Sequence, residues 1–152
     1  MPRNVLRVLA TMLVMLGLLT LGVTPAVAQE EPTVEVTIDQ ATIDPRTGEV
    51  TLTGTVTCSG FEEFVFAEMW GQLVQSVGRG GVWAPFHVLV APCTSEGATF
   101  SETFTAVQGT LRPGPAHLTA VIIACVPIYP ASACETRASD QLDTTIILTP
   151  AH

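Results

Sequence analysis

Residues 50–58 read Val-Thr-Leu-Thr-Gly-Thr-Val-Thr-Cys, and this stretch decides the fold class. Its apolar residues and cysteine occupy alternate positions, and threonine fills every position between them. Successive side chains of a strand point to opposite faces of a sheet, and threonine is favoured in strands, here on the face open to solvent. The stretch therefore predicts a strand with one buried face and one solvated face. The residues predicted to face the core are Val50, Leu52, Gly54, Val56 and Cys58.

The segments on both sides of this stretch continue the strand pattern. Residues 34–39 alternate between apolar and polar side chains, and residues 44–48 (Asp-Pro-Arg-Thr-Gly) predict a tight turn. Proline fixes φ in such a turn, and glycine adopts the left-handed conformation. Further strands are predicted over residues 64–77, 82–93, 98–107, 116–125 and 142–149.

Two of these predicted strands carry more specific signals. Pro85 and Pro92 favour an edge position or a strand end, because proline cannot donate a hydrogen bond to a neighbouring strand. Residues 116–125 are nearly all apolar, which predicts a central strand buried on both faces. About seven strands separated by turns predict an all-β, antiparallel immunoglobulin-like β-sandwich. The alternative is a closed barrel.

The first 28 residues read as a secretory signal peptide. Arg3 and Arg7 precede an apolar run over residues 8–21, and Pro25 to Ala28 (Pro-Ala-Val-Ala) end in the small-x-small pattern that a signal peptidase accepts. The run is too short for a membrane span. We therefore predict a cleaved signal at 1–28, a disordered N-terminus at 29–32, a β-sandwich domain at 33–149, and a secreted protein without a membrane anchor.

The mature chain is acidic. It contains no lysine and sets four arginines against fourteen acids, so its net charge is −10 with histidine neutral; the arginines are Arg46, Arg79, Arg112 and Arg137. Such a chain lacks the basic patch that binds nucleic acid or an anionic membrane, so neither partner is predicted. We interpret the acidity as a means of solubility outside the cell. A surface for a cation or a basic partner is the alternative.

Four cysteines follow the signal, and they predict two structural disulfides in an exported protein; they are Cys58, Cys93, Cys125 and Cys134. None has the C-x-x-C spacing of a zinc or redox site. Their spacing leaves two pairings open. One joins Cys58 to Cys93 and Cys125 to Cys134. The other joins Cys58 to Cys125 and Cys93 to Cys134, and it is similar to the antibody pattern because Trp70 lies between Cys58 and Cys125.

Two stretches resemble a family of small exported actinobacterial domains with no assigned function. Residues 48–58 (GEVTLTGTVTC) resemble the opening strand of the family, and residues 109–118 (GTLRPGPAHL) resemble its mid-domain corner. The resemblance spans roughly residues 44–148. In the family, a cysteine on the early strand is followed by a second one before the corner, which implies a Cys58–Cys93 disulfide. Cys125 and Cys134 are additions here, which implies that they pair with each other. The resemblance implies no activity.

The hairpin between Cys125 and Cys134 is the first candidate for binding. Residues 126–131 (Val-Pro-Ile-Tyr-Pro-Ala) are apolar and contain the only tyrosine and two prolines. Ordering a loop that is already stiff costs little entropy on binding, so Val126, Ile128 and Tyr129 are predicted contact residues. The alternative is that the loop folds back on the end of the domain.

The second candidate is an aromatic-lined cleft near the turn at residues 78–81. Trp70 and Trp83 are its predicted contact residues, and three phenylalanines would join them: Phe61, Phe64 and Phe66. Packing of the same five side chains in the core is the interpretation that the sequence favours.

The sequence contains no pattern typical of a catalytic site. It lacks the G-x-S-x-G motif of a nucleophilic serine. His87 and His117 lie outside any motif with metal-ligand spacing, and Glu62, Glu63 and Glu68 are interpreted as solvated carboxylates. We therefore predict no catalytic residue, no metal site and no cofactor.

These observations predict a secreted, non-catalytic module that binds an extracellular protein or a cell-surface component. The alternative is a carrier of a small hydrophobic ligand, because the chain is similar in bulk to the enediyne-binding apoproteins. Those proteins are exported, acidic sandwiches of about this size with two disulfides, one of which closes a short loop. The first cysteine pair is wider here and their ligand-lining motifs are not recognised, so this alternative rests on an analogy of fold.

Overall fold

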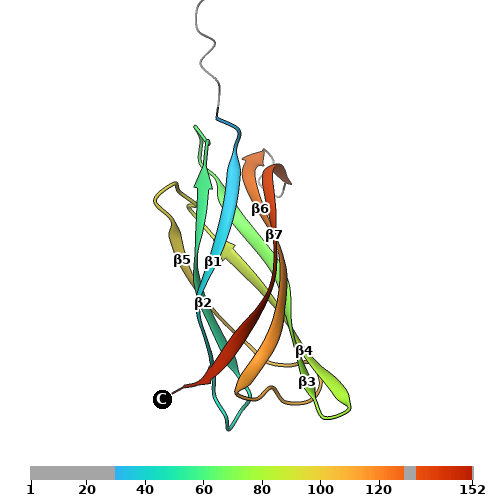
Figure 1. The fold of residues 1–152 in the computed structure, drawn as a ribbon. Coiled ribbons are helices and arrows are strands. Elements are labelled where there is room, and N and C mark those ends of the chain that lie inside the picture. Colours follow the sequence, from blue (N-terminus) through green and yellow to red (C-terminus); the bar gives the residue numbers. More distant parts are fainter. Residues whose placement is uncertain (1–29, 129–132, 152) are drawn as a thin grey trace, which may run out of the picture.

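The computed structural model describes residues 30–128 and 133–151. The predicted signal peptide, Gln29, residues 129–132 and His152 lie outside the described residues. Within the two described ranges the chain forms seven β-strands and no helix, which confirms the all-β prediction (Figure 1). The strands are β1 (Thr33–Ile43), β2 (Val50–Ser59), β3 (Phe66–Val77), β4 (Gly80–Val90), β5 (Ala98–Phe104), β6 (Gly114–Ile128) and β7 (Ala133–Pro150). In this part of the chain there is accordingly no helix long and apolar enough to cross a membrane.

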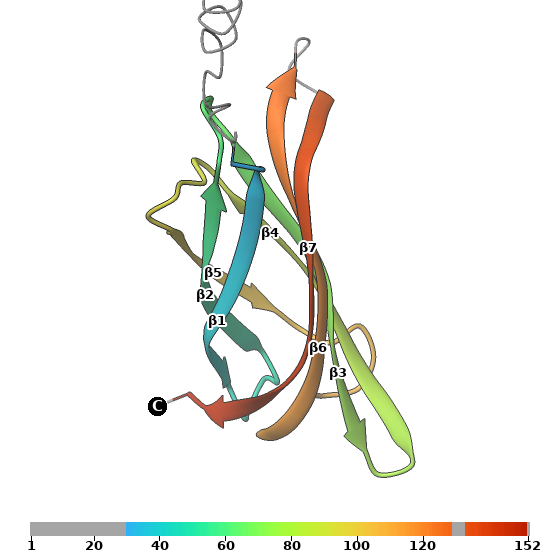
Figure 2. The ribbon, with the colours of Figure 1, turned by 45° about the horizontal axis from the view of Figure 1, so that its top comes forward.

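The strands form one curled sheet in the order β4-β3-β6-β7-β1-β2-β5. Neighbouring strands are antiparallel except β1 and β7, which run parallel over Thr42–Thr149 and Ile43–Pro150. The prediction of a purely antiparallel arrangement is therefore wrong at this junction. The reason is visible in Figures 1 and 2: β7 runs along the molecule in the same direction as β1, and its last residues reach the end of β1.

The curl brings the inner faces of the two outermost strands together. The rings of Phe86 on β4 and Phe104 on β5 stack with their centroids 5.1 Å apart. The connection that follows β5 also reaches β4, because the Val107 N–H donates a hydrogen bond of 3.2 Å to the Trp83 carbonyl. The largest fully buried side chains of the core are Ile43, Leu52, Met69, Leu73, Leu111, Leu118, Ile122 and Leu148.

The stretch at residues 50–58 folds as predicted. It forms β2, and its residues alternate between buried and half-buried along its length, with the threonines on the more exposed side. The predicted turn connects β1 to β2, and in it the Gly48 N–H donates to the Asp44 carbonyl over 2.8 Å. Gly48 has a φ of +74°, the conformation that the turn requires of it. The local pattern was therefore sufficient to place this hairpin.

Both disulfides have the pairing that the family resemblance implies. Cys58 at the end of β2 bonds to Cys93 in the segment after β4, and Cys125 on β6 bonds to Cys134 on β7. The antibody-like pairing is therefore wrong. The backbone explains why: the Cys58 N–H donates to the Thr94 carbonyl over 3.0 Å, so the segment after β4 lies against the end of β2.

One polar side chain, Gln75 of β3, is buried in the core. Its Nε2 donates to the carbonyls of Arg112 (2.8 Å) and Pro115 (3.3 Å), and its Oε1 accepts a bond of 2.8 Å from the Arg112 N–H. A corner between strands leaves backbone groups without a ladder partner, and a buried group without a partner is costly. Gln75 provides hydrogen-bond partners for the backbone groups of Arg112 and Pro115, and it thereby holds the β5–β6 connection against β3.

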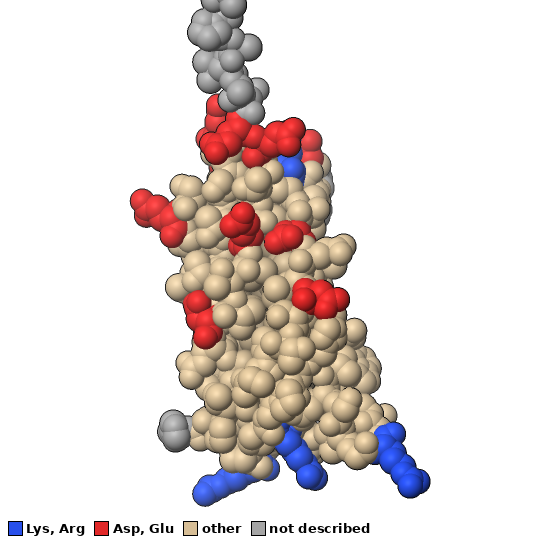
Figure 3. All heavy atoms as spheres, viewed as in Figure 1, with Lys and Arg blue, Asp and Glu red and all other residues tan. Residues whose placement is uncertain are grey.

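Three of the four arginines in the described ranges lie at one end of the molecule, and acidic side chains lie at the other end and along the side that Figure 3 shows. The connections β1–β2, β3–β4 and β5–β6 lie at the arginine end and carry Arg46, Arg79 and Arg112, together with Asp44 and Glu49 of the β1–β2 connection. The connections at the other end, together with the residues before β1 and the start of β7, are acidic. The acidic residues there are Glu30, Glu31, Glu62, Glu63, Glu96 and Glu135. Arg137 lies among them and pairs with Glu135 over 3.1 Å.

Candidate functional site

The outer face of strands β4, β3, β6 and β7 carries the candidate site, which we call the aromatic face. Its residues alternate along each strand with those that face the core. Cross-strand pairing aligns them in rows, and the central row contains His87, Trp70, Val121 and Gln141. The adjacent row, toward the β3–β4 turn, contains Pro85, Gln72, Thr119 and Asp143. The row beyond it in the same direction contains Trp83, Val74, His117 and Thr145. Leu89, Glu68, Ile123 and Ser139 form the row on the other side of Trp70.

Both tryptophans lie on this face, and each is 43% exposed. Core packing, which the sequence favoured for them, is therefore wrong. The period of two along each strand explains their position. Met69 and Leu73 of β3 face the core, so Trp70 must face outward, and the buried Ala84 of β4 places Trp83 outward in the same way. Alternation within these strands was the signal that could have identified the exposed face.

The three phenylalanines do not join the tryptophans, so the predicted five-residue cleft near the turn at residues 78–81 is wrong. Phe61 and Phe64 lie in the β2–β3 connection, at the opposite end of the molecule from that turn. Phe64 is exposed, and Phe61 is half-buried against the core. Phe66 begins β3 opposite Cys125 and is half-buried. β3 runs from one end of the molecule to the other. The phenylalanines at or before its start are therefore far from the turn at residues 78–81 that follows its end.

The hairpin closed by the second disulfide differs from the predicted contact loop. Val126 lies within β6, pairs with Glu135 and is buried, so it is not available as a contact residue. Ile128 ends β6 and is 42% exposed. Tyr129 and the rest of the predicted tip lie outside the described residues.

β6 is central in the sheet, but it is not buried on both faces as predicted. Its inward residues Leu118, Ala120 and Ile122 are buried, whereas the outward Val121 is 44% exposed. No other element of the described ranges covers this side of the sheet. A continuous apolar run gives no alternation from which the exposed face can be read, which explains the error.

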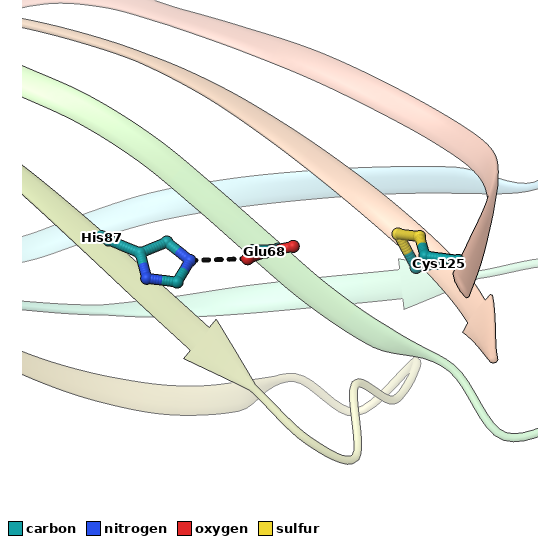
Figure 4. The surroundings of a disulfide bond; sticks show 4 residues. Glu68, His87 and Cys125 are labelled. Carbon is teal, nitrogen blue, oxygen red and sulfur yellow. Dashed lines mark hydrogen bonds and ion pairs between the residues drawn. A yellow bond between two sulfur atoms is a disulfide. The ribbon is translucent and has the colours of Figure 1, made fainter. Parts of the chain in front are cut away.

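Two histidines on the aromatic face pair with carboxylates. His87 Nε2 lies 2.7 Å from Glu68 Oε1, and His117 Nε2 lies 3.2 Å from Asp143 Oδ1. Figure 4 shows the His87 ring facing the Glu68 carboxylate. The His87 ring also stacks on Trp70, with centroids 5.5 Å apart and planes inclined by 15°. Glu68 thus anchors His87, and His87 supports the indole of Trp70. An indole held in this way loses little entropy when a ligand covers it.

A shallow pocket of about 430 Å³ opens beside Trp70. Its walls combine the apolar surfaces of Trp70, Pro85 and Val121 with polar side chains. The polar side chains that line it are Gln72, Thr119, Gln141 and Asp143. Apolar surface with a few convergent polar groups is typical of a ligand site. No three His, Cys, Asp or Glu side chains in the described part of the chain gather as a metal site.

No protein-family model matches the chain, and no curated protein matches it.

Proposed function

We propose that the protein is a secreted, non-catalytic module that binds an extracellular or cell-surface partner through the aromatic face. One observation carries this proposal: Trp70 is 43% exposed at the centre of the face, and His87 and Glu68 hold it in place. Leaving an indole in water is unfavourable, and exposed apolar residues that gather on one face mark interaction surfaces. Val121 and Leu89, both exposed, extend this apolar surface on the two neighbouring strands.

The outer face of β1, β2 and β5 provides a comparison within the same molecule. Threonine dominates it, and Thr51 and Thr103 share a hydrogen bond of 3.2 Å between their Oγ1 atoms. Hydroxyl groups keep such a face compatible with water, so it needs no partner. The contrast between the two outer faces is our reason for assigning the contact to the aromatic face.

The extracellular setting and the finer fold belong to the same proposal. Residues 1–28 have the pattern of a signal peptide, and disulfides persist in oxidising compartments. We describe the fold as an immunoglobulin-like sandwich, with β1-β2-β5 as one layer and β4-β3-β6-β7 as the other. The stacked rings of Phe86 and Phe104, one from each layer, support this description.

The carrier of a small hydrophobic ligand remains the second candidate, with less support. A carrier needs a cavity that encloses most of its ligand in apolar surroundings. The pocket beside Trp70 is open to solvent, and Gln72, Gln141 and Asp143 contribute polar groups to its lining. These features suit a ligand that is itself polar and partly solvated.

Photo-cross-linking tests which surface binds. A photoreactive phenylalanine analogue in place of Val121 should form covalent adducts when the protein is irradiated on cells of its source organism, because residue 121 lies at the centre of the aromatic face. The same analogue in place of Thr53, on the threonine face, is the control and should form at least severalfold fewer adducts. The analogue is also placed at Ile128, at the end of β6. Adducts obtained equally from positions 121 and 53, or only from position 128, would show that the aromatic face is not the contact surface.

A further inference from the structure

We infer that the partner of the aromatic face is an uncharged cell-surface polysaccharide, one sugar ring of which stacks on Trp70. This inference rests on the proposed function and names the class of ligand. It depends on the free surface of the indole, the polar groups around it, the charges of the face and the position of the second tryptophan.

The indole of Trp70 has one side available to a flat ligand. His87 stacks on it from β4, while the other pocket walls come largely from β6 and β7, including Val121 and Gln141. A pyranose ring presents C–H groups on its faces and hydroxyl groups around its rim. The C–H groups can pack on an aromatic face, which carries a negative electrostatic potential toward their partly positive hydrogens. The pocket beside Trp70 therefore provides a platform for such a ring.

The polar lining of the pocket fits the rim of the same ring. Gln72 and Gln141 each offer an amide that both donates and accepts hydrogen bonds, Thr119 offers a hydroxyl, and Asp143 accepts. Gln72, Thr119 and Asp143 lie in the row next to Trp70, about 7 Å away along the strands. An apolar ligand would displace the water that is hydrogen-bonded to these groups and would offer no hydrogen bonds in its place, which is costly. A ligand with many hydroxyl groups replaces those bonds.

The charges of the face favour an uncharged polymer over an anionic one. Fourteen acids against four arginines give residues 30–151 a net charge of −10, which repels phosphate-rich or carboxylate-rich polymers. The carboxylates of the aromatic face, Glu68 and Asp143, each pair with a histidine. In the row of Trp70 and the row of Gln72, every side chain other than His87 and Asp143 is uncharged. The face thus complements a neutral ligand.

Trp83 extends the site toward the end of the molecule that carries the arginines. It lies four residues from His87 along β4, with Pro85 between them, so its Cα atom is about 14 Å from that of Trp70. A single sugar cannot reach both indoles, but a chain of several sugars can. We therefore expect affinity to rise with chain length until the ligand spans both tryptophans.

The test uses the secreted protein with Trp83→Phe, which leaves Trp70 as the only tryptophan of the mature chain. Soluble glucans, mannans, galactans, arabinans and xylans are the neutral probes, and polygalacturonate is the charged control. A saturable change in Trp70 fluorescence with at least one neutral polysaccharide, and none with polygalacturonate, is the expected result. Failure of every neutral polysaccharide to bind would overturn the inference.

A matched pair of variants separates stacking from general apolar contact. Trp70→Phe keeps an aromatic face and should retain most of the affinity for the neutral polysaccharide that binds. Trp70→Leu keeps apolar area without a π-face and should bind about tenfold more weakly. Thr53→Ala, on the outer face of β2, should bind as the unmodified protein does. Equal affinities of the Phe and Leu variants would contradict stacking.

The photo-cross-linking experiment separates failure of this inference from failure of the proposed function. If no neutral polysaccharide binds but residue 121 captures a protein, the ligand class is wrong and the proposed function stands. If neither a polysaccharide nor any adduct is found at residue 121, both are wrong.

Discussion

Replacement of Cys58 and Cys93 together by alanine should lower the free energy of unfolding by about 4 kcal/mol. The two cysteines are 35 residues apart, and a cross-link over that distance removes much of the conformational freedom of the unfolded chain. In the folded protein the bond also joins the end of β2 to the segment after β4. Denaturant titration monitored by circular dichroism measures the loss.

The second disulfide provides the control for this prediction. Cys125 and Cys134 are only nine residues apart, so their joint replacement by alanine should cost about 2.5 kcal/mol on the same chain-entropy model. β6 and β7 are also paired over most of their length, which keeps this hairpin together without the bond. A larger loss from the Cys125/Cys134 pair than from the Cys58/Cys93 pair would contradict the prediction.

Gly71→Ala should destabilise the protein by about 2–3 kcal/mol, within the range found for overpacked cores. Gly71 of β3 lies directly opposite Phe86 of β4, and the Phe86 ring covers the glycine on the inner face of the sheet. An added Cβ would overlap the ring of Phe86 and would lie 2.7 Å from the Thr119 carbonyl oxygen of β6. Phe86 also stacks on Phe104, so it cannot move aside without disturbing β5.

Gly80→Ala is the matched control, and a thermal melt of the two variants decides between them. A Cβ at Gly80 would meet no atom within 4 Å, and its φ is not positive, so we expect a change of less than about 0.5 kcal/mol. The Gly71 variant should melt roughly 10 °C below the unmodified protein. Equal melting temperatures for the two variants would show that the contact between Gly71 and Phe86 is not needed for packing.

The fold was predictable where the sequence alternates clearly. The threonines of residues 50–58 identified β2 and its solvated face, and Asp44 and Gly48 identified the preceding turn. The parallel contact of β1 with β7 was not predictable, because it depends on where β7 ends in space and not on any local pattern. The role of Gln75 was hidden for the same reason: its partners Arg112 and Pro115 are distant in sequence.

The candidate site was predictable only in part. Trp70 and Trp83 were identified as contact residues, but the sequence favoured their burial because large aromatic side chains are usually buried. Their exposure follows from their alternation with Met69 and Ala84. The side chain that stacks on Trp70 comes from another strand: His87 lies 17 residues further along the chain, and only the pairing of β3 with β4 brings it to Trp70.

Retention of the protein on cells of its source organism tests directly whether the aromatic face makes the contact. Trp70→Ala combined with Trp83→Ala removes both indoles from the aromatic face, and Ile128→Ser changes the exposed residue at the end of β6. Trp70 and Trp83 are each 43% exposed, so their removal also loses packing against the sheet, and circular dichroism must show that the double variant is folded at the temperature of the assay. We predict that the double variant is washed from the cells while the Ile128→Ser variant is retained like the unmodified protein. Retention of the double variant together with loss of the Ile128→Ser variant would place the contact at the hairpin and not at the aromatic face.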